Sequence, residues 1–352
     1  MAIYELIYTS TFIDGTHIKA SGLAYVPQQS TGTAPLISYN HGTEIEKERK
    51  LEVAGETGIC ISYAADGYAV LSPDYFGMAK GEGKLLYMHL ATEAQCGYDL
   101  IKAGEQFFSQ INFTISHQLF LTGYSQGAHA SMALLKMLEA EPIEGFTLSG
   151  ASPMSGPYNL EFTVLQGGER KYAYPSFFMM LLKTYNELVN NKPDICNLLR
   201  SPYDSLVPPV MDGKHSLEHI NTFLPDTPFR ALKPDFVWSL KTDSNNTFRQ
   251  FLRENSLHHF YTHAPLQLCY CEGDKISNKG NTLQYYQYLS EQKKKNVVLK
   301  SAGKKFNHWH CAYFAIVYTK MYFDSMRSDK APAKNLGSKK AALALGKLFV
   351  KK

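Results

Sequence analysis

Apolar residues along this chain fall into two patterns that indicate strands. Residues 3–8 and 18–26 alternate apolar and polar side chains on either side of an Asp14-Gly15 turn, which is typical of an antiparallel pair of strands. Continuous apolar runs, by contrast, are typical of strands that are buried on both faces. Such runs cover residues 35–39, 68–71 and 119–122, and further strands are expected at 266–270 and 297–299.

Helical patterns lie between these runs. Apolar or small residues recur at helical spacing over 89–108, and residues 128–138 are rich in good helix formers. Two further helices are expected at 282–292 and 312–326. Strands that alternate with helices predict a mostly parallel sheet with helices on both of its faces. The sequence therefore predicts an α/β fold.

This alternation is interrupted in the middle of the chain. Helical fragments at 177–189 and 246–253 are separated by stretches rich in proline, and the strand–helix pattern returns only afterwards. One sheet interrupted by an inserted, largely helical cap explains this order. The predicted organisation is a first core part at 1–151, a cap at 152–261, a second core part at 262–330 and a basic tail at 331–352, which we expect to be a surface helix or a disordered end.

The distribution of charge argues against a nucleic-acid partner. The whole chain has a formal net charge of +4, but six lysines lie after Ala331, so the rest of the chain carries about −2. No basic patch interleaved with aromatic residues is present. No apolar run reaches the length of a transmembrane helix, so we expect no stable insertion into a membrane. A small molecule is the expected partner, and the oligomeric state is not legible from the sequence.

The cysteines and the N-terminus leave the compartment open. Six cysteines in a chain of this length do not form a disulfide scaffold, and Cys269 and Cys271 alternate on one predicted strand, where they are badly placed to pair with each other. No leader precedes Tyr4 in this sequence. The protein is therefore either cytoplasmic, or secreted or periplasmic with its leader removed.

The clearest chemical motif is Gly123-Tyr124-Ser125-Gln126-Gly127. A predicted strand enters it and a predicted helix leaves it. A tight turn between a strand and a helix strains the backbone at the serine, and small flanking residues are needed there. The serine hydroxyl is then exposed at the carboxyl end of the sheet, near a helix N-terminus. We therefore predict Ser125 as a nucleophile.

A serine nucleophile needs a base, and the base needs a third group that holds it in place. The motif resembles the nucleophile turn of α/β hydrolases, in which the order along the chain is serine, acid, histidine. Asp274 follows the strand predicted over 266–270 and is the expected acid, with Glu272 in reserve. His308 lies in the loop expected before the final helix and is the predicted base, with His310 in reserve.

Hydrolysis of an ester also needs donors for the oxyanion. One is expected to be the backbone amide of Gln126, the residue after the nucleophile. The other is expected from the loop after the third strand, where we predict the amide of Thr43 with Gly42 as its neighbour. Tyr124 and His41 lie beside these segments and are the predicted substrate-binding residues.

Several segments together resemble the bacterial and fungal secreted branch of the lipases and esterases among the α/β hydrolases. They are residues 40–43, 72–77, 123–127, 273–274 and 307–308, with a similar opening at 8–27. The resemblance covers most of 1–151 and 262–326 and barely touches the cap. It implies the triad Ser125, Asp274 and His308, a capped apolar acyl site, and export from the cytoplasm.

Two further residues could be mistaken for members of the triad. Asp74 also ends a predicted strand, but it precedes Ser125, which is the wrong order for this fold, so we interpret it as a structural hydrogen-bonding residue. His129 lies one helical turn beyond the nucleophile, beneath or beside it rather than opposite it. We interpret it as structural as well.

A metal site is the main alternative of another chemical class. Cys269 and Cys271 alternate on one predicted strand and form a first cluster of possible ligands. A second cluster consists of His308, His310 and Cys311, and the fold is expected to bring the two clusters near one another. Zinc sites more often use cysteines separated by two to four residues. Cysteines in a buried strand are commonly small apolar fillers. We therefore predict no metal.

The predicted function is the hydrolysis of carboxylic esters with short-to-medium acyl chains, without a cofactor. A serine peptidase or a thioesterase would use the same machinery. A non-catalytic ligand-binding protein could also keep this fold, although a complete set of serine, acid and histidine argues against it. The apolar run at 177–182 suggests a lid over the cleft, and such a run is more often the core of a cap than an acyl channel.

Overall fold

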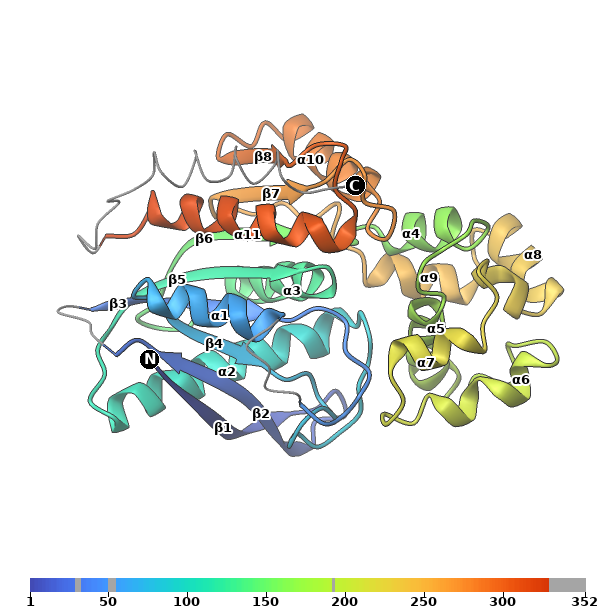
Figure 1. The fold of residues 1–352 in the computed structure, drawn as a ribbon, viewed down its shortest axis with the longest axis horizontal. Coiled ribbons are helices and arrows are strands. Elements are labelled where there is room, and N and C mark those ends of the chain that lie inside the picture. Colours follow the sequence, from blue (N-terminus) through green and yellow to red (C-terminus); the bar gives the residue numbers. More distant parts are fainter. Residues whose placement is uncertain (29–32, 50–54, 192–193, 329–352) are drawn as a thin grey trace.

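The computed structural model describes residues 1–28, 33–49, 55–191 and 194–328. A central sheet carries helices on both of its faces, and a group of further helices lies beside it (Figure 1). The predicted basic tail at 331–352 lies outside the described residues, so the structure does not bear on that prediction.

The sheet has eight strands in the order β1-β2-β4-β3-β5-β6-β7-β8. Strands β3 to β8 run parallel, and β2 is antiparallel to both of its neighbours. The strands are β1 (Ala2–Thr11), β2 (His17–Val26), β3 (Ala34–Asn40), β4 (Ala69–Pro73), β5 (Ile115–Tyr124), β6 (Thr147–Met154), β7 (Leu266–Tyr270) and β8 (Val297–Ser301). The predicted mostly parallel sheet is confirmed, and the carboxyl ends of its parallel strands lie along one edge.

Alternate side chains of each buried strand enter cores on opposite faces of the sheet. Leu36 and Leu119 lie in the core beneath α2, α3 and α10, whereas Ile37 and Phe120 lie in the core beneath α1 and α11. These helices are α1 (Glu56–Ala65), α2 (Leu90–Gln110), α3 (Gln126–Ala140), α10 (Lys279–Glu291) and α11 (His308–Asp324). Both faces are therefore covered, which explains the continuous apolar runs of the strands.

The chain between β6 and β7 is here called the insert (residues 155–265). Its described residues form helices and no strand of the sheet. It is drawn from green to orange in Figure 1. Residues 179–182 of α5 are almost completely buried in a second core that is formed mainly by the insert. The helices are α4 (Leu160–Gly167), α5 (Ser176–Asn190), α6 (Tyr203–Leu206), α7 (Leu217–Thr222), α8 (Pro234–Thr242) and α9 (Thr247–Glu254), with 3-10 turns at Pro208–Val210 and Pro228–Ala231.

One strand of the sheet, β6, and one helix that packs on the sheet, α1, were not predicted. Strand β6 combines small and polar residues with Gly150 and Pro153, so it lacks the continuous apolar run of its neighbours. The predicted end of the first core part at 151 therefore falls inside this strand, which continues to Met154. Helix α1 contains Gly58 and β-branched residues such as Thr57, which are weak helix formers. Both elements are held by packing against the sheet rather than by local propensity.

Two glycines let α3 begin close to the end of β3. A Cβ atom at Gly127 would lie 1.9 Å from the backbone oxygen of Asn40, and a Cβ atom at Gly123 would lie 2.4 Å from the same oxygen. Real Cβ atoms do not approach backbone atoms so closely, and neither backbone can move without disturbing the sheet. The small residues of the Gly-x-Ser-x-Gly motif are therefore required by packing as well as by the turn.

We predict that Gly127→Ala destabilises the protein by about 3 kcal/mol or more, because the new methyl group meets backbone rather than a movable side chain. Urea denaturation followed by circular dichroism measures this. Lys136→Ala, at an exposed position of the same helix, is the matched control and should change the free energy of unfolding by less than about 0.5 kcal/mol. Equal stability of the two variants would contradict the packing argument.

Candidate active site

The backbone at Ser125 is strained. Strand β5 ends at Tyr124, α3 begins at Gln126, and Ser125 between them has φ 57° and ψ −116°. A serine rarely adopts a positive φ, and such strain persists only where the surroundings impose it. Here the Ser125 amide donates to the carbonyl of Met154 at 3.0 Å. The turn therefore has the strand–turn–helix geometry that exposes a nucleophile at the carboxyl edge of the sheet.

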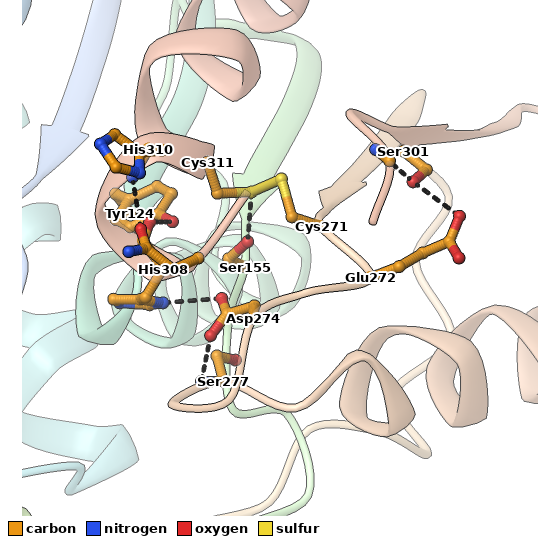
Figure 2. Close-up of a disulfide and its surroundings, with 12 residues drawn as sticks. Tyr124, Ser155, Cys271, Glu272, Asp274, Ser277, Ser301, His308, His310 and Cys311 are labelled. Atoms are coloured by element: carbon orange, nitrogen blue, oxygen red, sulfur yellow. Dashed lines mark hydrogen bonds and ion pairs between the residues drawn. A yellow bond between two sulfur atoms is a disulfide. The ribbon is translucent and has the colours of Figure 1, made fainter. Parts of the chain in front are cut away.

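Asp274 and His308 form a buried pair. The carboxylate oxygen Oδ2 of Asp274 lies 2.7 Å from Nδ1 of His308, and the two residues are only 4% and 3% exposed. The other carboxylate oxygen accepts hydrogen bonds from the amides of Ile276 at 2.9 Å and Ser277 at 3.0 Å. The loop after β7 thus fixes the carboxylate, and the carboxylate fixes the imidazole so that its Nε2 is turned away from Asp274 (Figure 2).

The two reserve residues lie elsewhere. The Glu272 carboxylate points away from the histidines and lies 3.5 Å from the Ser301 hydroxyl (Figure 2). His310 donates its backbone N–H to the side chain of Asn307, which caps α11. One local expectation was wrong, because α11 begins at His308 itself rather than after it. The structure brings together Asp274 and His308, and it does not bring Glu272 to either histidine.

A cavity of about 560 Å³ opens beside Ser125. Ser125 and His308 both line it, as do Tyr174 and Phe177 of the insert. A second cavity, of about 30 Å³, also reaches Ser125 and is lined largely by apolar side chains. These include Tyr87, Met88, Leu160, Phe177, Phe178, Leu181 and Ile276. The insert therefore covers the carboxyl edge of the sheet. The apolar run at 177–182 lies in the core formed mainly by the insert, and some of its residues also form part of the wall of this second cavity.

The predicted oxyanion donors lie in different surroundings. Thr43 lines the larger cavity, and its hydroxyl lies 3.1 Å from that of Tyr87. Gln126 is the first residue of α3, so its backbone N–H is one of the helix amides that lack a partner within the helix. The amide of Gly42, in contrast, donates to the Glu56 carboxylate at 2.8 Å. This amide therefore already has a partner, because Glu56 at the start of α1 faces it, and a role for Gly42 as the neighbour of Thr43 stays a prediction.

The predicted substrate-binding residues also contact protein groups. The Tyr124 hydroxyl donates to the backbone carbonyl of His308, and the two rings lie 5.0 Å apart. His41 packs against Tyr75, with ring centroids 4.3 Å apart, and burial lowers the pKa of His41 to about 4. Both residues line the larger cavity. Tyr124 therefore helps to hold His308 in place, and substrate contact by Tyr124 or His41 stays a prediction.

Glu56 is an acidic residue of the cavity that sequence reasoning missed. It lines the larger cavity at the start of α1. Burial raises the pKa of Glu56 to about 8, and the hydrogen bond from Gly42 only partly opposes this. A carboxyl group with such a pKa is largely protonated at neutral pH. The sequence carried no signal for it, since its helix was not predicted.

The structure gives Asp74 and His129 other partners. Asp74 accepts a hydrogen bond from Ser21 at 2.6 Å and pairs with Arg49. His129 lies between the Glu93 carboxylate, 2.6 Å from Nδ1, and the Asn255 carbonyl, 2.7 Å from Nε2. Burial alone would lower the pKa of His129, but the Glu93 carboxylate raises it above its usual value.

These contacts agree with structural roles for both residues. The His129–Glu93 pair is completely buried, and Glu93 also accepts a hydrogen bond from the side chain of Gln126. Through Asn255, which follows α9, this network joins the turn at Ser125 to the insert.

A disulfide joins Cys271 to Cys311. The sequence signal was present, because one cysteine precedes the expected acid and the other follows the expected base, but their pairing depends on the fold. Disulfide sulfurs are not thiolate ligands, so the alternative metal site loses two of its candidate ligands. Within the described residues, no group of three or more histidine, cysteine or acidic side chains is arranged to hold a metal ion. No helix in the same part of the chain is long and apolar enough to cross a bilayer.

Comparisons with protein-family models and with curated protein sequences gave no match. Among solved structures, the chain is similar to the rice cell wall degrading esterase LipA from Xanthomonas oryzae, with a TM-score of 0.84 and 25% identity over 92% of this chain and 91% of that one. Its fold is also similar to that of Candida antarctica lipase A in its closed state, with a TM-score of 0.70, 17% identity, and 93% and 79% coverage. The predicted α/β-hydrolase fold is confirmed, and these structures fit the predicted class of enzyme.

The raised pKa of Glu56 predicts a dependence of stability on pH. Its folded-state pKa of about 8 lies above the ordinary value of 4.5, so between these pH values the folded protein holds a proton that the unfolded chain has released. Stability from this group therefore falls as pH rises through that window. Glu56→Gln cannot ionise, and its stability relative to the wild type should rise steadily from pH 5 to pH 8 in urea denaturation. Glu141→Gln, at an exposed position, is the control, and a pH-independent effect of Glu56→Gln would contradict the prediction.

Proposed function

We propose that this chain, a carboxylic ester hydrolase with the α/β-hydrolase fold, forms an acyl-enzyme on Ser125. The observation that carries the proposal is the buried Asp274–His308 pair, whose imidazole lines the same cavity as the strained turn at Ser125. A carboxylate on Nδ1 leaves Nε2 as the free basic nitrogen, which is the arrangement that a serine nucleophile requires. The esterase LipA and Candida antarctica lipase A support the same chemistry by their similarity in fold.

In the first step, His308 Nε2 accepts the proton of Ser125 Oγ as this oxygen attacks the ester carbonyl carbon. The carbonyl double bond opens, and negative charge gathers on the carbonyl oxygen, where the amides of Thr43 and Gln126 donate hydrogen bonds. The Asp274 carboxylate stabilises the imidazolium through its hydrogen bond to Nδ1–H. The intermediate collapses, His308 gives its proton to the leaving alcohol, and the acyl group stays on Ser125.

In the second step, water takes the place of the alcohol. His308 removes a proton from the water as its oxygen attacks the acyl-enzyme, and the same two amides stabilise the new oxyanion. His308 then returns the proton to Ser125 Oγ, and the carboxylic acid leaves. The reaction consumes only ester and water, and it calls for no cofactor.

The two cavities support different roles. The apolar cavity of about 30 Å³ takes the acyl chain. A group the size of a water molecule needs about 10–15 Å³, so this cavity has room for roughly two or three heavy atoms. The larger cavity carries ionisable side chains such as Glu56, Asp74 and Glu218 and takes the alcohol portion of the ester. We therefore propose short acyl esters as substrates, at the lower end of the range expected from the sequence. The insert is proposed to be the cap.

Export from the cytoplasm is supported by the Cys271–Cys311 disulfide. Disulfides form and persist in oxidising compartments and are rare in the cytosol of mesophiles. The described cysteines outside this bond, which are Cys60, Cys96, Cys196 and Cys269, are free, so the bond would be a single local link and not a scaffold.

A series of nitrophenyl esters from acetate to octanoate tests both the reaction and the acyl site. We expect kcat/KM to be highest for acetate to butyrate and to fall for longer chains, because these overfill the small cavity. Ser125→Ala should lower kcat by roughly 10⁴-fold or more. A thioester and an amide that carry the best acyl group test for thioesterase and peptidase activity. We expect the amide to react most slowly. Full activity of Ser125→Ala would contradict the proposal.

The two neighbouring histidines give a second test. His308→Gln removes the proposed base and should lower kcat by at least about 10³-fold. His310→Gln is the matched control, since its side chain does not line either described cavity beside Ser125, and it should retain most of the activity. Steady-state kinetics on the best ester measures both. The assignment of the base fails if the His310 variant loses activity and the His308 variant keeps it.

A further inference from the structure

The disulfide lies between the proposed acid and the proposed base. Cys271 follows the end of β7, three residues before Asp274, and Cys311 lies in the first turn of α11, three residues after His308. Both cysteines are completely buried. Figure 2 shows the bond beside the Asp274–His308 hydrogen bond, with both links running from the β7 loop to the start of α11. The two segments are therefore joined once covalently and once through the proposed catalytic pair.

Other contacts hold each side mainly within its own segment. The Asp274 carboxylate accepts hydrogen bonds from the amides of Ile276 and Ser277, which belong to its own loop. Asn307 caps α11 by accepting a hydrogen bond from the amide of His310, which belongs to the same helix. These bonds orient each group locally, but they do not set the distance between the loop and the helix.

The remaining links between the two segments reach the loop before α11 rather than the helix. The amide of Glu272 donates to the carbonyl of Gly303 at 3.1 Å. Gly273 packs closely against the backbone oxygens of Lys304 and Phe306. The Tyr124 hydroxyl holds the carbonyl of His308 from the side of β5. Apart from the Asp274–His308 hydrogen bond itself, the disulfide is the link among these described contacts that ties the first turn of α11 directly to the β7 loop.

We infer that the Cys271–Cys311 disulfide is a positioning element for hydrolysis, because it holds the α11 turn that carries His308 against the loop that carries Asp274. The inference rests on the proposed function. A displacement of about 1 Å at a catalytic group can cost about 10²-fold in rate, and the link acts only three residues from each member of the pair. Its loss lowers the turnover of molecules that remain folded.

A purely structural disulfide would behave differently. Its loss would lower the free energy of unfolding, while the folded molecules would turn over at the wild-type rate. The two roles are therefore separated by measuring kcat and KM under conditions in which each variant is folded, with stability measured independently. A spectroscopic signature of the pair adds a second readout, namely the far-downfield proton signal of the Nδ1–H hydrogen bond between His308 and Asp274.

The experiment compares the wild-type enzyme with the double variant Cys271→Ala/Cys311→Ala. Cys96→Ala is the matched control, because it removes a buried free thiol from α2, which packs on the face of the sheet opposite to α11. For the double variant we expect kcat to fall at least tenfold with KM within about twofold, and the downfield proton signal to broaden or vanish. The control should keep both. A folded double variant with wild-type kcat and signal would overturn the inference.

Reduction of the wild-type enzyme covers the case in which the double variant does not fold. A water-soluble phosphine, applied in urea below the unfolding transition, converts the disulfide to two thiols and becomes the phosphine oxide by taking oxygen from water. Alkylation and peptide mass measurement then give the fraction of Cys271 and Cys311 that is reduced. Activity should fall with that fraction and return when oxidised glutathione restores the bond with release of two reduced glutathione molecules.

Three results would count against the inference or its premise. Reduced, folded enzyme that keeps full turnover would overturn it. So would free thiols at Cys271 and Cys311 in the wild-type enzyme as purified under oxidising conditions. Absence of ester turnover in the oxidised wild-type enzyme would instead remove the proposed function itself, and the inference with it.

Discussion

The hydrogen bond between the Asp274 carboxylate and Nδ1 of His308 joins two almost completely buried residues that are 34 positions apart in the chain. A buried carboxylate is costly unless polar groups satisfy it, and here two amides of its own loop and one imidazole do so. The bond exists only if β7, β8 and α11 lie as the parallel sheet places them. In return it leaves Nε2 as the nitrogen of His308 that is free for the proposed role as base.

The strained turn at Ser125 depends on the same sheet edge. Gly123 and Gly127 allow α3 to start against the carbonyl of Asn40, and this brings the serine to the mouth of a cavity that His308 also lines. The insert folds around its own apolar core and covers this edge with Phe177 and its neighbours. Packing of the sheet, strain at one residue and a separate helical layer thus meet in one place, which is the proposed site of attack on the ester carbonyl.

Much of this could be predicted from local pattern. Strand β7 was predicted at 266–270, where it is found, and the apolar runs located β3, β4 and β5 because both faces of the sheet are covered. Strand β6 and helix α1 were missed because their residues have weak propensities and are held by tertiary packing. The same reason hid Glu56, which occupies the Gly42 amide. The Cys271–Cys311 bond was hidden because its partners lie 40 residues apart and meet only when β7 and α11 are assembled.

The most direct test of the central claim is the site of covalent capture by an alkyl fluorophosphonate. Ser125 Oγ would attack phosphorus, fluoride would leave, and His308 would take the serine proton, so the reaction requires the proposed assembly and nothing else. Intact mass and peptide mapping locate the adduct. The account predicts one adduct per chain, on Ser125, with complete loss of esterase activity. An enzyme that hydrolyses esters but carries the adduct on another residue, or on none, would contradict it.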